Sequence, residues 1–422
     1  MSCRFLKIAS VALLCVAVSS VFALGLAEGA AKFLGSTTVE GHVPSDFGTY
    51  WNQITPERQC TWKTVEQTRG TFDFSECDIV YNWAKENKAT FTFHALLWCN
   101  YGIPAWLRNL NADETKEALT AWFDAVAEHY PDLELINVFS DVKRSNLIFN
   151  QLDTLIKALG GDDGEYTFIT TAFKMARERW PQAALFYSDI NTIQWERDKG
   201  INLIYTIRKN GAPIDAYGLD AGDLTAQGTG PMKCFPSDRL KSALQEIYEK
   251  TELPLLITGY NISTDVDSTQ KKCFAEHIPV FMQTEYVKGI TLWGYLYNLS
   301  TLQCITNLSI SCSGIIRDGE DRPAMTWLKE YFNFQEDTTA RDSTIADSTI
   351  SIGSSLHLQA STLQAYDVFD LNGVRLGRLR AYTMDEAVST LQNTSDIKVQ
   401  GVYMLRSVNN GTVKQVRIAQ AK

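Results

Sequence analysis

Aromatic and polar side chains occur together at the ends of several apolar segments of this 422-residue chain. Aromatic rings stack on the apolar face of a pyranose, and amide and carboxylate groups bind its hydroxyl groups. This combination predicts a carbohydrate-binding site. Alternatively, the tryptophans only fill the core at the strand ends. The residues expected at the site are His94, Trp98, Tyr101, Ser140, Asp141, Asp189, Asn191, Asp220, Tyr260, Asn261, Trp293 and Tyr295.

Short apolar segments alternate with longer amphipathic segments between residues 33 and 332. The alternation is typical of β-α units around a parallel sheet. A helix is predicted over 112–130, where Leu119, Trp122 and Val126 recur at helical spacing. Eight units in one chain favour a (β/α)8 TIM barrel over an open sheet, with function at the carboxyl ends of its strands. The predicted strands are 33–38, 59–63, 90–98, 133–141, 184–191, 214–220, 253–261 and 288–296.

The chain divides into four predicted parts. Residues 1–23 combine Arg4 and Lys7 with an apolar stretch and a small-residue cleavage site, which predicts a signal peptide and a secreted or surface-attached protein. That stretch is shorter than the about 20 residues of a transmembrane helix, and no later segment spans a bilayer. The barrel is expected over 24–334, a polar linker over 335–352 and a small all-β domain, a β-sandwich, over 353–422, where Asn-Gly turns separate apolar runs.

Charge and cysteine content narrow the possible partners. Lys and Arg total 39 and Asp and Glu total 49, so the net charge is −10. The sequence contains no run of basic residues that would bind phosphates, so nucleic acid is not an expected partner. No spacing of Cys or His indicates a metal site, and no cofactor is expected. Removing the predicted signal peptide leaves seven of nine cysteines, an odd number. Cys304 with Cys312, Cys234 with Cys273, and Cys60 with either Cys77 or Cys99 are the candidate disulfides.

Five segments resemble motifs of glycoside hydrolase family 10, the endo-β-1,4-xylanases. The segment 51–88 is similar to the second-strand region of that family. FHALLWCNYGIPAWL (93–107) resembles H-T-L-V-W-H-x-Q-x-P-x-W, FYSDIN (186–191) resembles N-D-Y-N, NGAPIDAYGL (210–219) resembles G-V-P-I-D-G-I-G, and GITLWGY (289–295) resembles G-I-T-x-W-G. The resemblance covers about 300 residues. It implies a TIM barrel that cleaves xylan with retention, using a Glu after the fourth strand as acid/base and a Glu at the end of the seventh as nucleophile.

The chain departs from the family at both catalytic positions. The family's W-D-V-V-N-E is INVFSD here, so Asp141 takes the acid/base position and Ser140 replaces the Asn. The family's I-T-E-L-D-I is ITGYNI, which places Gly259 at the nucleophile position. Glycine has no side chain that attacks a sugar, so the retaining route is closed.

Other positions of the family's substrate site are partly kept. His94, Trp98, Trp293 and Glu57 match the family, and the resemblance implies that they contact substrate. The changed positions are Arg58 for Asn, Thr61 for Lys, Tyr101 for Gln, Ile190 for Tyr and a position on or near Gly222 for His.

Three functions follow as hypotheses. The first is a carbohydrate-binding pseudoenzyme that binds xylan or a related plant cell-wall polysaccharide. The second is an active glycoside hydrolase that pairs Asp141 with a relocated carboxylate, Asp220 or Asp223. The alternative interpretation of Asp220 and Asp223 is that they are solvated loop residues without a catalytic role. The third is a structural or protein-binding part of a cell-surface assembly.

The C-terminal segment has a resemblance of its own. YDVFDLNGVRLGR and GVYMLRSVNNGTVKQVRI are similar to the hairpins of bacterial sorting domains of type IX-like secretion. The resemblance implies outer-surface secretion or attachment machinery as a partner. Plain β-sandwich or carbohydrate-binding modules share the same alternation and turns, and remain the alternative.

Overall fold

The structure is a computed structural model that describes residues 25–39, 42–99, 101–142, 149–222, 224–226, 233–297 and 313–334, together with four strands between 364 and 418. The predicted signal peptide (1–23) and linker (335–352) lie outside the described residues, as do Asp223, Cys304 and Cys312.

Parallel strands close into an eight-stranded barrel. Its third strand consists of two short segments, β3 and β4, and the pairing of β3 with β5 closes the ring. This arrangement confirms the predicted TIM barrel. In sequence order the strands are β1 (Phe33–Thr38), β2 (Gln53–Pro56), β3 (Thr90–Phe93), β4 (Leu97–Trp98), β5 (Leu135–Ser140), β6 (Ala184–Asp189), β7 (Ala216–Leu219), β10 (Leu255–Tyr260) and β11 (Val287–Leu292).

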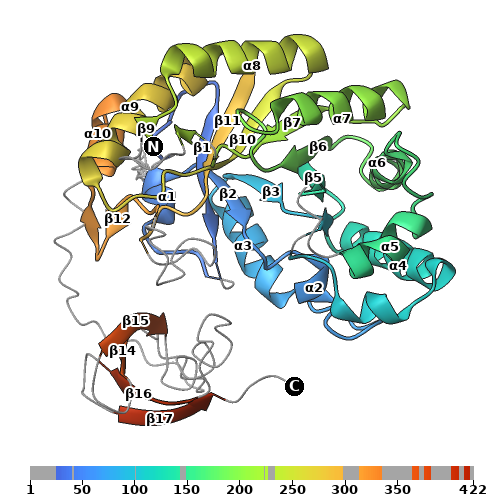
Figure 1. Cartoon of the computed structure of the whole chain (residues 1–422), viewed down its shortest axis with the longest axis horizontal. Coiled ribbons are helices and arrows are strands. Elements are labelled where there is room, and N and C mark those ends of the chain that lie inside the picture. The colour runs from blue at the N-terminus through green and yellow to red at the C-terminus, as the bar shows by residue number, and fades with distance from the viewer. Residues whose placement is uncertain are drawn as a thin grey trace, which may run out of the picture. The chain divides into compact units, whose positions relative to one another are not determined.

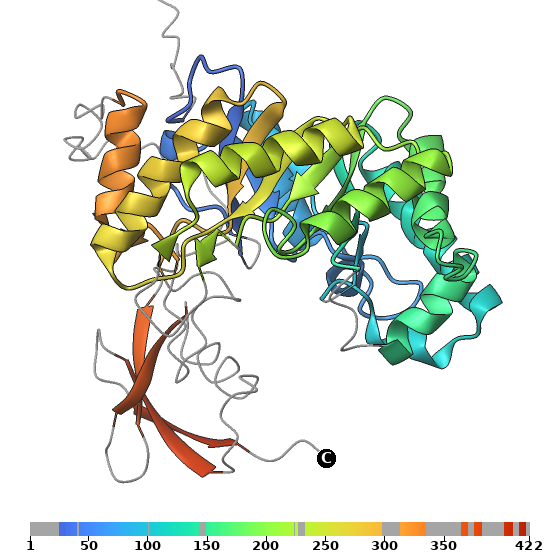
Figure 2. The same cartoon turned by 45° about the horizontal axis from the view of Figure 1, so that its top comes forward.

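Helices surround the barrel strands, as Figures 1 and 2 show. Two short antiparallel pairs, β8 (Thr225–Ala226) with β9 (Lys233–Cys234) and β12 (Ile316–Arg317) with β13 (Glu320–Asp321), accompany them. The helices are α1 (Phe47–Tyr50), α2 (Trp62–Val65), α3 (Ser75–Glu86), η1 (Ala105–Asn109), α4 (Ala112–His129), α5 (Phe149–Ala158), α6 (Thr167–Arg179), α7 (Arg197–Lys209), α8 (Ser237–Thr251), α9 (Asp267–Gln283) and α10 (Pro323–Tyr331).

Helix α4 confirms the helix predicted from its periodicity. Asn111 and Glu114 form a capping box, in which each side chain accepts a hydrogen bond from the backbone N–H of the other residue. Its apolar face is buried, and Trp122 stacks on Trp62 with ring centroids 6.0 Å apart. These contacts hold α4 and the segment that follows β2 against each other.

The predicted second strand was wrong in position. The segment 59–63 forms a turn and the start of α2, whereas β2 lies at Gln53–Pro56. The local sequence does not reveal this strand, because it is only four residues long and ends in proline, a residue that is uncommon in strands. Its pairing with both β1 and β3 fixes its place, and that pairing is a tertiary contact.

A hydrogen-bonded polar layer fills part of the barrel interior. The Gln53 amide donates to the hydroxyls of Thr55 and Thr92 and accepts from the Thr291 hydroxyl, over 2.7 to 2.9 Å. Gly35 makes room for this side chain, since a Cβ at residue 35 would lie 2.0 Å from Gln53 Oε1. Polar groups inside a barrel must satisfy one another in this way.

The C-terminal strands form one antiparallel sheet in the order β15-β14-β16-β17, coloured red in Figures 1 and 2. They are β14 (Gln364–Phe369), β15 (Arg375–Ala381), β16 (Gly401–Ser407) and β17 (Val413–Ile418). The β14–β15 and β16–β17 hairpins span the two predicted Asn-Gly turns. The prediction of a small all-β part is thus confirmed.

Among the helices the structure describes, none is long and apolar enough to cross a bilayer.

Candidate functional site

The barrel brings most of the predicted site residues to one end. In a closed parallel barrel the carboxyl ends of all strands meet at one face. Glu57, Trp98 and Asp141 lie at or just after the ends of β2, β4 and β5. Asp220 follows β7, Gly259 is the penultimate residue of β10, and Trp293 follows β11. The sequence prediction of a shared site is consistent with this placement.

Four aromatic side chains contact one another at this face. The His94 ring lies 4.8 Å from Trp98 and 5.5 Å from Trp293, between centroids. Trp98 also contacts Trp293 at 6.3 Å and Tyr101 at 5.0 Å. Three of these rings, His94, Trp98 and Trp293, are more than nine-tenths buried, and Tyr101 is partly exposed. The four rings hold one another in place and form a packed aromatic platform.

The carboxylate of Asp141 is buried and held by this platform. Trp98 Nε1 donates a hydrogen bond to Asp141 Oδ2 at 2.7 Å. The backbone N–H of Asp141 donates to the Ser188 carbonyl at 3.2 Å, and its φ of 60° lies in the left-handed region. A non-glycine residue in that conformation is uncommon and is often found at a functional site.

A hydrogen-bond network supports the platform from inside the barrel. The Asn137 amide nitrogen lies 3.1 Å from His94 Nδ1 and donates to Ser188 Oγ at 2.7 Å, and Ser188 Oγ lies 3.0 Å from Ser140 Oγ. Burial lowers the pKa of His94 to about 3, so its imidazole is neutral near pH 7. A neutral His94 orients its neighbours and supplies no positive charge.

Sequence reasoning missed Asn137 and Ser188. A polar residue inside the apolar strand LELINVFSD was the signal for Asn137, because a buried amide requires partners. Ser188 had no comparable signal, since serine is common in strands and loops alike.

Asp220 lies against Gly259, the residue at the expected nucleophile position. A Cβ built on Gly259 would lie 3.1 Å from Asp220 Cγ and 3.2 and 3.4 Å from its two carboxyl oxygens. Asp220 Oδ1 accepts a hydrogen bond from the Gly222 N–H at 2.9 Å, which holds the carboxyl group there. An acidic group from β7 therefore occupies the space beside the backbone of β10.

Asp189 is fully buried and serves as an acceptor within the fold. Its oxygens accept hydrogen bonds from the Tyr187 hydroxyl at 2.5 Å and from the Ile190 N–H at 2.9 Å. Burial raises the pKa of the Cys99 thiol well above its usual range, with the charges of Asp141 and Asp189 adding to the effect.

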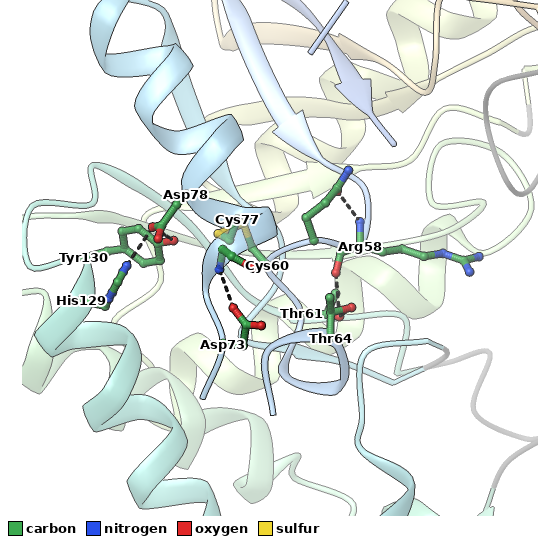
Figure 3. The surroundings of a disulfide bond; sticks show 11 residues. Arg58, Cys60, Thr61, Thr64, Asp73, Cys77, Asp78, His129 and Tyr130 are labelled. Carbon is green, nitrogen blue, oxygen red and sulfur yellow. Dashed lines mark hydrogen bonds and ion pairs between the residues drawn. A yellow bond between two sulfur atoms is a disulfide. The ribbon is translucent and has the colours of Figure 1, made fainter. Parts of the chain in front are cut away.

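The turn after β2 carries Glu57 and Arg58 and is tied to helix α3. Figure 3 shows the disulfide between Cys60 and Cys77 beside this turn. The Thr61 hydroxyl donates to the Arg58 carbonyl at 2.9 Å, and Glu57 is fully buried. The structure contains two of the candidate disulfides, Cys60 with Cys77 and Cys234 with Cys273. Cys99 is a buried free thiol.

Tyr260 and Tyr295 lie away from the platform. The Tyr260 ring packs on Phe274 and Phe281 of α9, and its hydroxyl lies 3.2 Å from His277 Nδ1. Side chains alternate along a strand, so Tyr260 points toward the helices when its neighbour Gly259 faces the interior. Tyr295 donates from its hydroxyl to Asp46 Oδ1 at 2.8 Å. Both rings belong to the packing of the barrel with its surrounding helices and loops.

A metal ion has no evident ligand set in the described part of the chain. No group of three or more His, Cys, Asp or Glu side chains there is arranged to hold one.

Comparison with known proteins identifies the family. Residues 16–315 match the family model of glycosyl hydrolase family 10. The chain belongs to this family. It is 33% identical over 306 residues to endo-1,4-beta-xylanase B of Cellvibrio japonicus, covering 72% of this chain and 46% of that protein. It is 26% identical over 246 residues to endo-1,4-beta-xylanase 3 of Hypocrea jecorina, covering 57% of this chain and 65% of that protein. The chain thus spans less than two thirds of these curated relatives.

Solved family 10 structures share the fold. The chain aligns with native xylanase 10B of Thermotoga maritima at a TM-score of 0.60 and 20% identity, covering 73% of this chain and 97% of that one. Xylanase 10B of Thermotoga petrophila in complex with xylobiose aligns at 0.60 and 19%, covering 73% and 96%. At this identity the likeness concerns the barrel alone.

Proposed function

We propose that this family 10 barrel binds xylan, or a related plant cell-wall polysaccharide, without cleaving it by the retaining mechanism. The observation that carries the proposal is the pairing of Gly259 with the carboxyl group of Asp220. A retaining glycosidase needs two carboxyl groups about 5 to 5.5 Å apart, one of them as the nucleophile. Position 259 offers no such group.

The acid/base position supports the same proposal. The Asp141 side chain is shorter than that of a glutamate by one C–C bond, about 1.5 Å. One of its carboxyl oxygens already accepts a hydrogen bond from Trp98 Nε1. General acid catalysis requires hydrogen-bond contact with the glycosidic oxygen. A shorter side chain held against the aromatic platform is poorly placed to supply it.

Sugar binding rests on aromatic and polar groups at this face, of which Tyr101 and Ser140 differ from the family's residues. His94, Trp98, Tyr101 and Trp293 form the aromatic platform, and Glu57, Ser140 and Asp220 supply polar atoms around it. Stacking on rings and hydrogen bonding to hydroxyls need no nucleophile, so binding survives when catalysis is lost.

Two measurements on the full chain test the proposal. Isothermal titration with a series of xylo-oligosaccharides should give saturable heats, and a reducing-sugar assay on xylan, mixed-linkage glucan and cellulose should give no turnover. Trp98→Ala should weaken binding, with Trp327→Ala on α10 as the control. Absence of binding across the series would reject the proposal, and turnover would turn attention to the second candidate.

The position of Asp220 favours hydrolysis by another route as a second candidate. An inverting glycosidase uses a base about 6.5 to 9.5 Å from the acid, with a water between them. Asp220 in the space beside Gly259 is the candidate base and Asp141 the acid. Turnover that is lost in both Asp141→Asn and Asp220→Asn would establish this function, whereas turnover unchanged in either variant would exclude it.

Export and surface attachment complete the proposal for the whole chain. The supporting features are the signal-peptide pattern of residues 1–23 and the β14–β17 sheet with its sorting-domain resemblance. Fractionation of the producing cell, with and without residues 353–422, tests attachment. A surface assembly function predicts instead that the barrel captures an envelope protein while no glycan binds.

A further inference from the structure

The backbone at Arg58 is fixed at the edge of the candidate site. Arg58 N donates to Gln59 Oε1 at 3.0 Å, and its carbonyl accepts from both Thr61 N and Thr61 Oγ1, at 3.0 and 2.9 Å. The disulfide of Cys60 closes the same turn onto α3. In Figure 3 the guanidinium of Arg58 points away from this disulfide.

The guanidinium is held by two neighbours that leave part of it exposed. Its Cζ lies 4.8 Å from the centroid of the Tyr101 ring, and Nε lies 3.8 Å from Glu57 Oε1 without a hydrogen bond. The Arg58 side chain is 40% exposed. Because the ring covers one face and Glu57 lies beside Nε, the terminal nitrogens Nη1 and Nη2 are the donors available to a ligand.

A continuous row of contacts connects this guanidinium to the centre of the site. Arg58 stacks on Tyr101, Tyr101 contacts Trp98, and Trp98 donates to Asp141. Trp98 is almost fully buried and Tyr101 is partly exposed, so a sugar bound on Tyr101 would lie next to Arg58. Arg58 is thus placed to meet a substituent of that sugar.

Among the described residues at this face, Arg58 carries a positive charge that is complementary to a carboxylate. Asp141, Asp189 and Asp220 are acidic groups of the described site away from Arg58, whereas Glu57 lies 3.8 Å from Arg58 Nε. A carboxylate elsewhere on the ligand would meet like charge. A guanidinium fork, in contrast, matches the two oxygens of a carboxylate.

We propose that Arg58, oriented by Tyr101, binds the carboxylate of a uronic acid carried by the polysaccharide, so that the site selects acidic over neutral xylan-type chains. The inference rests on the proposed carbohydrate-binding function and adds the substrate class. Arg58 stands where the family resemblance places an asparagine, so the charge is a feature of this chain.

Titration of the full chain with three matched ligands tests the inference. The ligands are a neutral xylo-oligosaccharide, the same backbone with one glucuronic acid branch, and the methyl ester of that branched compound. We expect the acid to bind about tenfold more tightly than its ester at low salt. Arg58→Gln should abolish this preference and leave the neutral ligand within about twofold. Arg108→Gln, an exposed arginine on η1, removes the same charge and should keep the preference.

The outcomes separate this inference from the function on which it rests. Equal affinity for acid and ester, or a preference that persists in Arg58→Gln, would overturn the role of Arg58 while neutral binding still supports the proposed function. Failure of all three ligands to bind would reject both.

Discussion

The carboxyl group of Asp220 lies 3.1 Å from the point where a Cβ of Gly259 would stand. Asp220 directly follows β7, and Gly259 lies in the neighbouring strand β10. Gly259 occupies the position that the family resemblance assigns to the nucleophile. An acid thus lies in the space that a side chain at residue 259 would enter. A side chain at residue 259 would therefore press on the carboxyl group of Asp220.

A double-mutant cycle measures this contact. Gly259→Ala should destabilise the protein by about 1 kcal/mol, because the new methyl group presses on a carboxyl group that a hydrogen bond to Gly222 N holds in place. In an Asp220→Ala background the same change should be neutral or stabilising, since the space is open and alanine reduces the entropy of the unfolded chain. Urea unfolding of the four proteins gives the coupling free energy, and additive effects would contradict the prediction.

Restoring the family's catalytic residues should require three changes together. Gly259→Glu alone should give no xylan hydrolysis, because Asp220 fills the space that the new side chain needs. Adding Asp220→Ala and Asp141→Glu should produce a measurable release of reducing sugar, since two glutamates then stand where a retaining mechanism needs them. Hydrolysis by Gly259→Glu alone would show that Asp220 does not obstruct the position.

Trp98→Phe tests how strongly the aromatic platform holds Asp141. The substitution keeps a ring but removes the Nε1–H donor from a buried carboxylate, so the free energy of unfolding should fall by about 1 to 3 kcal/mol. In an Asp141→Asn background the loss should be smaller, because an uncharged acceptor forms the weaker hydrogen bond. Chemical denaturation of the pair of backgrounds provides the comparison, and an equal loss in both would argue against a charge-assisted bond.

The disulfide between Cys60 and Cys77 should stabilise both the fold and the site. It closes a loop of 17 residues, which corresponds to about 3 kcal/mol in the chain-entropy model. The Cys60→Ser/Cys77→Ser variant should unfold at lower denaturant and bind xylo-oligosaccharides more weakly, because it frees the turn that carries Glu57, an expected substrate contact. The Cys234→Ser/Cys273→Ser variant is the control, since that disulfide joins β9 to α9 and should affect stability without affecting this turn.

Stability should fall between pH 7 and pH 5 because two histidines are buried in the neutral form. Burial lowers the pKa of His277 to about 4 and that of His94 to about 3. The unfolded chain, with histidine pKa values of about 6.5, takes up protons in this range that the folded chain does not. The stabilisation is complete above pH 6.5 and is lost as the pH falls toward 4, about 2 kcal/mol per histidine by pH 5.

His277→Gln isolates one of these contributions. The difference in unfolding free energy between pH 7 and pH 5 should be smaller by about 2 kcal/mol in the variant than in the parent protein. Urea midpoints at the two pH values provide the measurement, and the other titrating groups are common to both proteins. An unchanged pH dependence would mean that His277 has the same pKa in the folded chain as in the unfolded chain, contrary to the prediction.

The amino-acid sequence by itself determined the barrel and the residues that most of its strands carry at their carboxyl ends. Apolar periodicity is a local property, so alternating strands and helices such as 112–129 can be read without a structure. Placing Trp98, Asp141 and Trp293 together required only that parallel strands share a carboxyl end. The prediction that Tyr260 belongs to the site considered only its aromatic character. Side chains alternate along a strand, and this rule, applied to β10, places Tyr260 on the opposite side from Gly259.

Only the tertiary structure decided the contacts between distant segments. It chose Cys77 over Cys99 as the partner of Cys60, because disulfide formation depends on the distance and direction of side chains in space. It placed β2 at Gln53–Pro56 through pairing with both neighbours. It also set Asp220 against Gly259 and Arg58 over Tyr101, which are separated by 39 and 43 positions in the sequence. Such pairs carry no local pattern, since the folded barrel alone brings them together.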